Sequence, residues 1–264
     1  MKRTLLKSFC LTLFWYGIAE LATAQGIVVN MKDGTKVYYK ASEVQSVGVY
    51  GYGEGPYDAP DDQAYVDLGL PSGTLWATMN VGAKNPEENG DYFAWGETIG
   101  YNGGKTIFNW TTYKYCSGDY NTMWKYCTSS AYGTVDDNKT ELEPEDDAAT
   151  ANWGEAWKMP TIDQFNELVN KSYTTLEWTT LDGINGIKIT SKSNLKSIFL
   201  PAAGYRYDSL EEEGLKGYYW SSSLESPYSC NKSEVLSIYN SGASTLFSSY
   251  RQCGYSIRPV RAKK

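Results

Sequence analysis

The stretches Lys216-Gly-Tyr-Tyr-Trp-Ser-Ser-Ser223 and Arg251-Gln-Cys-Gly-Tyr-Ser-Ile-Arg-Pro-Val260 decide the expected fold. Both are rich in aromatic or branched side chains that favour a pleated, half-buried surface, and in the second these alternate with polar residues. Two more strand candidates, 234–239 and 245–250, lie between them and flank a turn-rich segment at 240–243. We therefore expect an antiparallel meander of about four strands in the core of one domain.

Two short helices are expected before the meander. The first runs from Pro144 to Gly154 and carries acidic residues in its first turn, where the helix dipole favours negative charge. The second begins at a capping box formed by Thr161 and Gln164 and continues as one apolar stripe. Further strands are expected at 65–68, 75–80, 91–95, 178–180, 186–190 and 197–200. The pattern predicts an α+β domain.

The two opening stretches also carry a resemblance. Together with 66–77, 90–97, 157–161 and 199–206, they resemble the Fibrobacter succinogenes major paralogous domain, which is common in surface proteins of Bacteroides-type bacteria. The resemblance covers roughly residues 64–262 in the family's order. It implies a C-type-lectin-like fold, related to formylglycine-generating enzymes and to the C-terminal domain of a collagen-like bacterial adhesin.

The N-terminal part predicts export. Residues 1–24 read as a signal peptide, with a basic start, an apolar core and a small-residue cleavage site at Ala22-Thr-Ala24. Residues 25–50 read as a small β-hairpin module built on an Asp-Gly turn, with a third short strand at 44–50. Residues 51–63, rich in glycine, proline and acids, read as a linker to a main domain at 64–264. We expect a secreted, cell-surface or periplasmic protein without membrane insertion.

Composition narrows the function classes. The formal net charge is −7 at pH 7, which disfavours binding to nucleic acid. The chain contains no histidine, the residue that most often serves as general base and as transition-metal ligand. We therefore expect a protein that is not an enzyme.

Residues 97–143 are the expected binding region. This segment, called the excursion below, has little periodicity and is too long for an ordinary connection. It is rich in rings that can stack on sugars while their polar atoms bond hydroxyl groups. The candidate ligand-binding residues are Trp110, Tyr113, Tyr120 and Trp124. The alternative is that these rings form the excursion's own small core.

Five cysteines are present, and Cys10 lies in the predicted signal. The other four allow three connectivities in an oxidising compartment. Continuing the ladder beyond residues 234 and 250 would bring Cys230 opposite Cys253, which leaves Cys116 to pair with Cys127. The alternative is that either pair stays reduced.

No metal site is predicted. Calcium is kept only as a candidate, because 136–138, Glu141 and Glu143 supply oxygen ligands, but their spacing matches no EF-hand and a solvated acidic loop explains them as well. Trp220 is expected in the scaffold. Arg258 is expected to pair with Asp91 or Glu97 and so fasten the end of the chain to its beginning.

The expected function is a non-catalytic binding or adhesion module that recognises a glycan or a surface protein through the excursion. The alternative is a structural or assembly subunit of a cell-surface adhesin or matrix. A remote alternative, implied by the resemblance, is an enzyme of the formylglycine-generating type. The sequence leaves the oligomeric state open.

Overall fold

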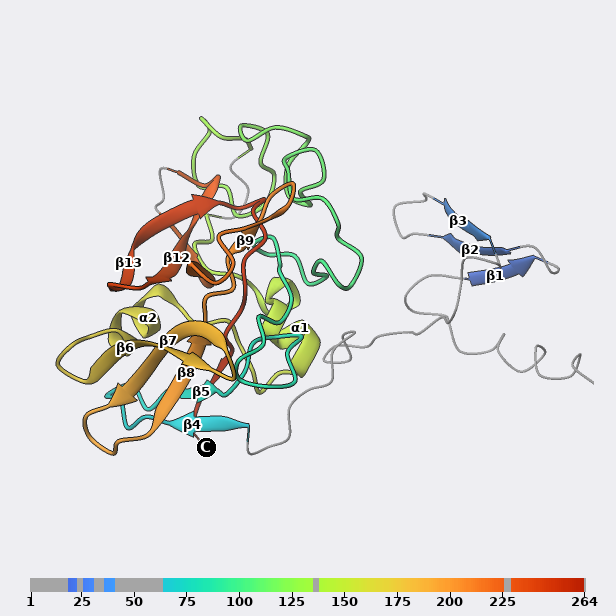
Figure 1. The fold of residues 1–264 in the computed structure, drawn as a ribbon. Helices are drawn as coiled ribbons and strands as arrows, with labels where there is room; N and C mark the ends of the chain where they lie inside the picture. Colours follow the sequence, from blue (N-terminus) through green and yellow to red (C-terminus); the bar gives the residue numbers. More distant parts are fainter. Residues whose placement is uncertain are drawn as a thin grey trace, which may run out of the picture. The chain divides into compact units, whose positions relative to one another are not determined.

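A computed structural model of the protein describes residues 64–134, 138–225 and 229–263, together with the backbone of three strands before residue 41. The chain divides into two compact units, residues 1–49 and 50–264. The described residues form mostly antiparallel sheets with few helices, which confirms the predicted α+β class (Figure 1). Among them, no helix is long and apolar enough to cross a membrane.

The first unit contains one antiparallel sheet in the order β1-β2-β3. Its strands are β1 (Ala19–Ala22), β2 (Gly26–Asn30) and β3 (Lys36–Lys40). Strands β2 and β3 pair as the predicted hairpin requires. Strand β1 lies inside the segment predicted to be a signal peptide. The Asp-Gly turn and the strand predicted at 44–50 lie outside the described residues.

In the second unit, one small sheet joins the beginning of the domain to its end. Its order is β14-β5-β4, formed by β4 (Tyr65–Asp67), β5 (Leu75–Ala77) and β14 (Val260–Arg261). Strand β5 is central, and Trp76 faces Val66 on one side and Val260 on the other. The last residues of the chain therefore complete the sheet with which the domain begins.

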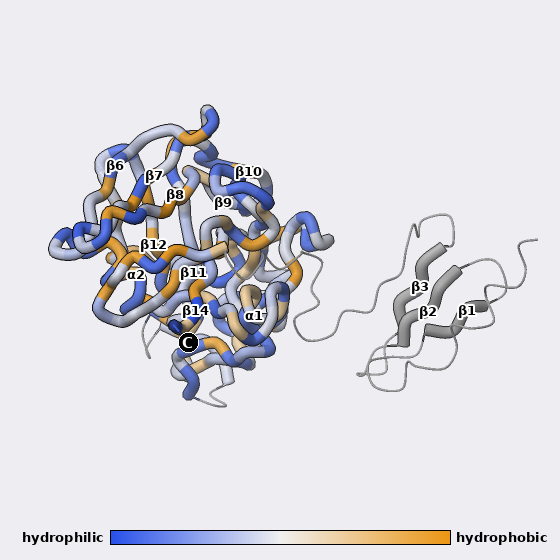
Figure 2. Tube along the Cα trace, turned by 90° about the horizontal axis from the view of Figure 1, so that it is seen from below, coloured by the Kyte–Doolittle hydropathy of each residue, from blue (hydrophilic) through white to orange (hydrophobic). Residues whose placement is uncertain are grey.

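A second sheet consists of β6 (Thr174–Leu181), β7 (Ile184–Ser191) and β8 (Ser197–Pro201), all antiparallel. On β7, buried Ile187 and Ile189 flank exposed Lys188, which is the period-two pattern of a strand with one face in the core. Figure 2 shows this alternation of hydrophobic and hydrophilic residues along β7. These strands form a sheet of their own rather than continuing the meander.

The meander itself has three strands, not the predicted four. It consists of β11 (Lys216–Leu224), β12 (Lys232–Tyr239) and β13 (Gly242–Tyr250), and β13 stands at one end of the order β11-β12-β13. A turn at 251–253 takes the chain away from the ladder, and the amide of Cys253 donates to the carbonyl of Tyr250 at 3.0 Å. Between this turn and β14, isolated bridges form, such as Tyr219 with Ser256 and Phe93 with Tyr255.

Two pieces complete the framework. A short pair, β9 (Tyr205–Arg206) and β10 (Leu210–Glu211), precedes the meander. Trp220 of β11 is fully buried and donates from Nε1 to the carbonyl of Phe93 at 2.8 Å. The segment 91–95, predicted to be a strand, is thus held by individual hydrogen bonds and one isolated bridge rather than by a strand ladder.

The helices lie close to where the sequence predicts them. The first splits into a 3-10 turn, η2 (Pro144–Asp146), and α1 (Ala148–Trp153), because Asp147 is extended and its side chain caps α1 by accepting from the amide of Thr150. The second, α2 (Ile162–Leu168), begins with the predicted capping box, in which both reciprocal bonds of Thr161 and Gln164 are present. This part of the prediction is confirmed.

Two hydrophobic clusters fill the domain. The aliphatic cluster lies between α2 and the sheets and includes Leu68, Phe165, Ile187, Leu200 and Leu236. The ring-rich cluster joins the excursion to β11 and to the C-terminal segment, and includes Trp95, Phe108, Tyr115, Tyr126 and Trp220. In Figure 1 the excursion, drawn in green, lies beyond β12 and β13, at the opposite end of the domain from β4.

Candidate functional site

In its described residues, 97–134 and 138–143, the excursion contains no regular strand. Its backbone is joined by isolated bridges, antiparallel between Cys116 and Met123 and parallel between Met123 and Gly133. At Gly133, φ is +150° and an added Cβ would lie 2.0 Å from the carbonyl oxygen of Met123, so only glycine fits this approach. A similar close contact fastens the excursion to the C-terminal segment, since a Cβ on Gly254 would meet the ring of Phe108 at 2.7 Å.

Asp146 is the polar centre to which the excursion is anchored. The repeated triplet Lys-Tyr-Cys, at 114–116 and 125–127, brings two lysines and two tyrosines to this one buried carboxylate. Lys114 Nζ lies 3.1 Å from Oδ1, which also accepts from the hydroxyl of Tyr115. On Oδ2, Lys125 Nζ lies at 2.6 Å and the hydroxyl of Tyr126 at 2.7 Å.

These bonds control the ionisation of Asp146. Burial by itself would raise the pKa of this carboxyl, but hydrogen bonds from Lys125, Tyr115 and Tyr126 outweigh it and hold the pKa below its ordinary value. The carboxylate is therefore charged at neutral pH and fully partnered. The repeated triplet can be seen in the sequence, but its common partner cannot, because nothing in the sequence pairs residue 146 with residues 115 and 126.

Arg251 fastens the excursion to the meander. Its guanidinium is fully buried, and Nε donates to the hydroxyl of Tyr113 at 2.7 Å. One terminal nitrogen donates to the carbonyl oxygens of Cys230 (2.7 Å) and Tyr126 (3.3 Å), and the other to that of Lys125 (3.2 Å). Its Cζ also lies 4.6 Å from the ring centroid of Trp95. The guanidinium thus satisfies carbonyl groups that no strand ladder reaches.

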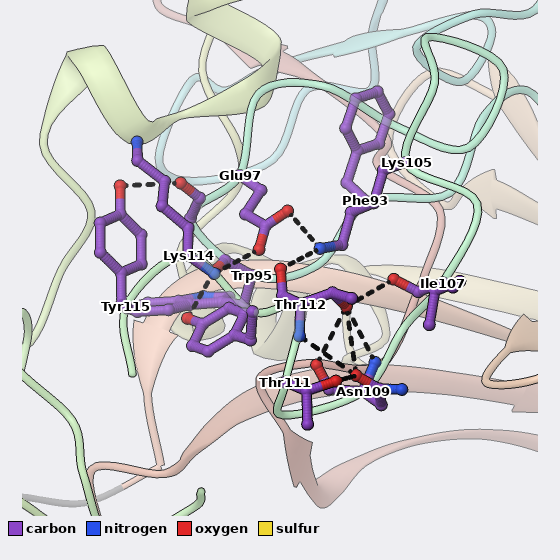
Figure 3. Close-up of polar contacts among 12 residues, drawn as sticks. Phe93, Trp95, Glu97, Lys105, Ile107, Asn109, Thr111, Thr112, Lys114 and Tyr115 are labelled. Carbon is purple, nitrogen blue, oxygen red and sulfur yellow. Dashed lines mark hydrogen bonds and ion pairs between the residues drawn. The ribbon is translucent and has the colours of Figure 1, made fainter. Parts of the chain in front are cut away.

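The beginning of the excursion has its own ion pair. Lys105 Nζ lies 2.7 Å from Glu97 Oε2, and Glu97 Oε1 accepts from the amide of Lys114 at 2.8 Å (Figure 3). In the same loop, Thr112 Oγ1 donates to the carbonyl of Ile107 at 2.8 Å. Glu97 therefore fixes the path of the chain that leads into the first Lys-Tyr-Cys triplet.

The predicted ligand-binding rings divide into two groups. Tyr113 is wrong as a ligand-binding residue, because it is only 3% exposed and its hydroxyl donates to the carbonyl of Trp95 at 2.8 Å. Trp110 is half-buried and packs edge-on against Tyr250, with 5.8 Å between ring centroids. Tyr120 and Trp124 are 47% and 45% exposed. Most rings of the excursion therefore form a core, and a few remain available to a ligand.

Trp124 is exposed yet held in place. Its amide donates to the carbonyl of Tyr115 at 3.0 Å, and its ring meets that of Tyr115 edge-on, with 5.3 Å between centroids. Lys114 Nζ lies 4.7 Å from the centroid of the same Tyr115 ring. Since the hydroxyl of Tyr115 is hydrogen-bonded to Asp146, the polar centre also fixes the ring against which Trp124 packs.

The acidic residues between 141 and 146 have protein partners. Glu141 accepts from the hydroxyls of Ser222 and Ser223. These two serines of β11 therefore have a structural role. The carboxylates of Glu143, Glu145 and Asp146 lie close enough together to hold a metal ion. However, Lys125 Nζ lies 3.2, 3.9 and 2.6 Å from their oxygens, so an ammonium group already pairs with all three carboxylates. Residues 136 and 137 lie outside the described residues, and calcium binding stays a prediction.

The cysteines are arranged differently from the predicted pairs. Cys127 Sγ lies 2.7 Å from Cys230 Sγ, and in this structure no disulfide bond joins any two of the four described cysteines. The predicted pairs Cys230–Cys253 and Cys116–Cys127 are therefore wrong. The ladder does register residue 232 with residue 250, but the turn at 251–253 carries Cys253 away before it can face Cys230.

The predicted ion pair of Arg258 is also wrong. Neither Asp91 nor Glu97 is a partner of its fully buried guanidinium. Its acceptors are Asn80 Oδ1 (2.8 Å) and the carbonyl oxygens of Ala77 (3.1 Å) and Phe199 (3.0 Å). Asp91 instead accepts from the amides of Tyr92 (2.7 Å) and Asn102 (2.9 Å). Arg258 still fastens the end of the chain to β5, but through neutral acceptors.

A cavity is also present outside the excursion. It has a volume of about 390 Å³ and lies on the sheet β6-β7-β8, where Glu177, Lys188 and Phe199 contribute to its lining. None of its lining residues belongs to the excursion or is a cysteine.

No protein-family model, curated protein or solved structure matches this chain. The resemblance to the Fibrobacter succinogenes major paralogous domain therefore stays a prediction.

Proposed function

We propose that this protein is an exported, non-catalytic binding module that recognises a glycan through the exposed rings of the excursion. The observation that carries the proposal is Trp124, a large ring that is 45% exposed although its backbone and its base on Tyr115 are fixed. A rigid exposed ring loses little conformational entropy when a sugar stacks on it. Tyr120, equally exposed, would contribute a second contact.

Thiol chemistry supports the non-catalytic part of the proposal. Burial raises the pKa of Cys253 to about 11 and that of Cys127 to about 12, and it also raises the pKa of Cys116. Thiolates, the reactive form, are therefore scarce at neutral pH. With no histidine in the chain, this weakens the remote alternative of a formylglycine-generating enzyme. We also propose that the domain has the C-type-lectin-like fold that the resemblance implies.

A glycan array tests the proposal directly. We expect the full chain to bind a defined set of glycans, and Trp124→Ala to weaken that binding at least about tenfold. Tyr173→Ala and Tyr207→Ala are matched controls, because these rings are 39% and 40% exposed and lie outside the excursion. An array without any bound glycan, or full binding by Trp124→Ala, contradicts the proposal. A surface protein captured through Trp124 instead would replace the glycan as ligand.

A second candidate function is assembly with other copies of this chain. Strand β13 ends its sheet, and on it Leu246 is 97% exposed while Phe247 and Tyr250 are 39% and 46% exposed. An edge strand with exposed apolar side chains is a template for pairing with a second chain. Sedimentation over a range of concentrations tests this: self-association that Leu246→Lys abolishes favours assembly, and a strict monomer rejects it.

A further inference from the structure

Cys127 and Cys230 meet although they come from distant parts of the chain. Cys127 closes the second Lys-Tyr-Cys triplet of the excursion, and Cys230 lies just before β12. Both residues are fully buried, and their sulfur atoms are 2.7 Å apart. This is far closer than two non-bonded sulfur atoms ordinarily approach, and only modestly longer than a disulfide bond of about 2.05 Å.

The surroundings hold both cysteines in this position. One terminal nitrogen of Arg251 donates to the carbonyl of Cys230 at 2.7 Å and to that of Tyr126, the neighbour of Cys127, at 3.3 Å. The carbonyl of Ser129 lies 3.3 Å from Cys127 Sγ and 4.0 Å from Cys230 Sγ. The same guanidinium thus fixes the backbone beside each sulfur. Among the described residues, the group able to hold a metal contains neither cysteine.

We propose that Cys127 and Cys230 form a disulfide bond that fastens the excursion to the meander, and that Cys116 and Cys253 remain thiols. Cys116 Sγ instead donates to the carbonyl of Trp110 at 3.0 Å, and Cys253 is buried near Ser249 and Tyr255. The proposal is independent of the ligand of the excursion.

The oxidant belongs to the class of small disulfides, represented by oxidised glutathione. The two thiols release two protons and two electrons, and one S–S bond forms between Cys127 and Cys230. The glutathione disulfide accepts those electrons and protons, its S–S bond breaks, and two glutathione thiols result. Both cysteines are fully buried in the folded protein, and burial raises the pKa of Cys127 to about 12, so this thiol exchanges poorly and the bond has to form while the chain folds.

The sequence makes the test unusually clean. Cleavage after lysine and arginine, except before proline, places the four described cysteines in four different peptides, 115–125, 126–139, 217–232 and 252–261, and Cys10 in a fifth, 8–32. The full chain is refolded from the reduced, unfolded state in a glutathione redox buffer, its free thiols are alkylated, and the unreduced digest is analysed by mass spectrometry. We expect peptide 126–139 linked to 217–232, and alkyl groups on peptides 115–125 and 252–261.

Other digests overturn the proposal. A link between 217–232 and 252–261, or between 115–125 and 126–139, establishes a different pairing, and four alkylated cysteines show that no bond forms. As a second measurement, Cys127→Ser and Cys230→Ser should each lower the unfolding midpoint of the oxidised protein, and the double variant should lower it no further. Cys116→Ser is the control, because it should leave the linked peptide and the loss of midpoint on reduction unchanged.

Discussion

The aliphatic cluster and the ring-rich cluster achieve order by different means. Around the aliphatic cluster, the ladders of β6–β8 and β11–β13 satisfy the backbone, and the side chains need only fill space. Around the ring-rich cluster, no such ladder forms among the residues of the excursion that the structure describes. There, the carbonyl groups are satisfied by polar ends of buried side chains, such as Tyr113 to Trp95 and Arg251 to Lys125. An irregular segment can thus be fixed when its core residues carry hydrogen-bonding atoms.

The comparison predicts opposite sensitivities. Substitutions that remove side-chain volume should destabilise the protein most in the aliphatic cluster. In the ring-rich cluster, substitutions that remove polar atoms should destabilise it even when side-chain volume is kept. The substitutions below test this difference.

Phe165→Ala should have the largest effect. Phe165 is fully buried in the aliphatic cluster and packs against Trp76, with 5.7 Å between ring centroids. Its removal should lower the free energy of unfolding by about 3–5 kcal/mol, measured by urea unfolding. Tyr173→Ala, at a 39% exposed ring, is the control. A loss below about 1 kcal/mol for Phe165→Ala would show that this cluster is not a packed core.

Arg251→Met should cost about 3 kcal/mol although the side chain keeps much of its length, because several buried carbonyl groups lose their donor. Urea unfolding measures the loss. Lys188→Met, an equivalent change at an exposed position on β7, should stay within about 0.5 kcal/mol of the unchanged protein. Equal stabilities of the two variants would refute the polar role of Arg251.

Asp146→Asn should cost about 2 kcal/mol at pH 7, because hydrogen bonds to a charged group are lost. The pKa of Asp146 is lowered in the folded protein, so its stabilisation is complete above the unfolded pKa of about 3.9 and is lost as pH falls through the lower folded pKa. The difference between the two proteins should therefore shrink below about pH 4. Glu145→Gln, at an exposed carboxylate beside Lys125, is the matched control.

Asp147→Asn should change how steeply the free energy of unfolding depends on pH. Burial outweighs the bonds from the amides of Thr150 and Met159 and raises the pKa of Asp147 to about 6. Between about pH 4 and this value the unfolded chain ionises first and binds fewer protons, so stability falls as pH rises. In the variant, the free energy of unfolding should decrease less steeply with pH over this range.

Glu234 also makes the stability of both proteins fall as pH rises, since burial and nearby Glu225 raise its pKa to about 7. The slope must therefore be compared between the variant and the unchanged protein. Identical slopes from pH 4 to pH 6 would remove Asp147 from the explanation.

Local patterns in the sequence predicted the local structure. The capping box at Thr161, the hairpins and the period-two strands depend on neighbouring residues, and the structure contains them. The same reasoning extended the meander one strand too far, because the turn at 251–253 is held by tertiary bonds of Arg251 rather than by glycine or proline.

The candidate site was harder to predict, because its contacts are distant in sequence. Hydrophobic character alone could not separate buried Tyr113 from exposed Tyr120, since their environments depend on Arg251 and on the path of the excursion. An ion pair seemed the natural partner for a buried arginine, yet Arg251 and Arg258 both use neutral acceptors. The repeated Lys-Tyr-Cys triplet was the one local signal that pointed toward the polar centre at Asp146.

Hydrogen–deuterium exchange on Asp146→Asn tests most directly whether this polar centre orders the excursion that presents Trp124. We predict faster amide exchange across residues 97–134 than in Glu145→Gln, with unchanged protection in β6, β7 and β8. Unchanged exchange in the excursion, or an equal loss of protection in both clusters, would contradict the account.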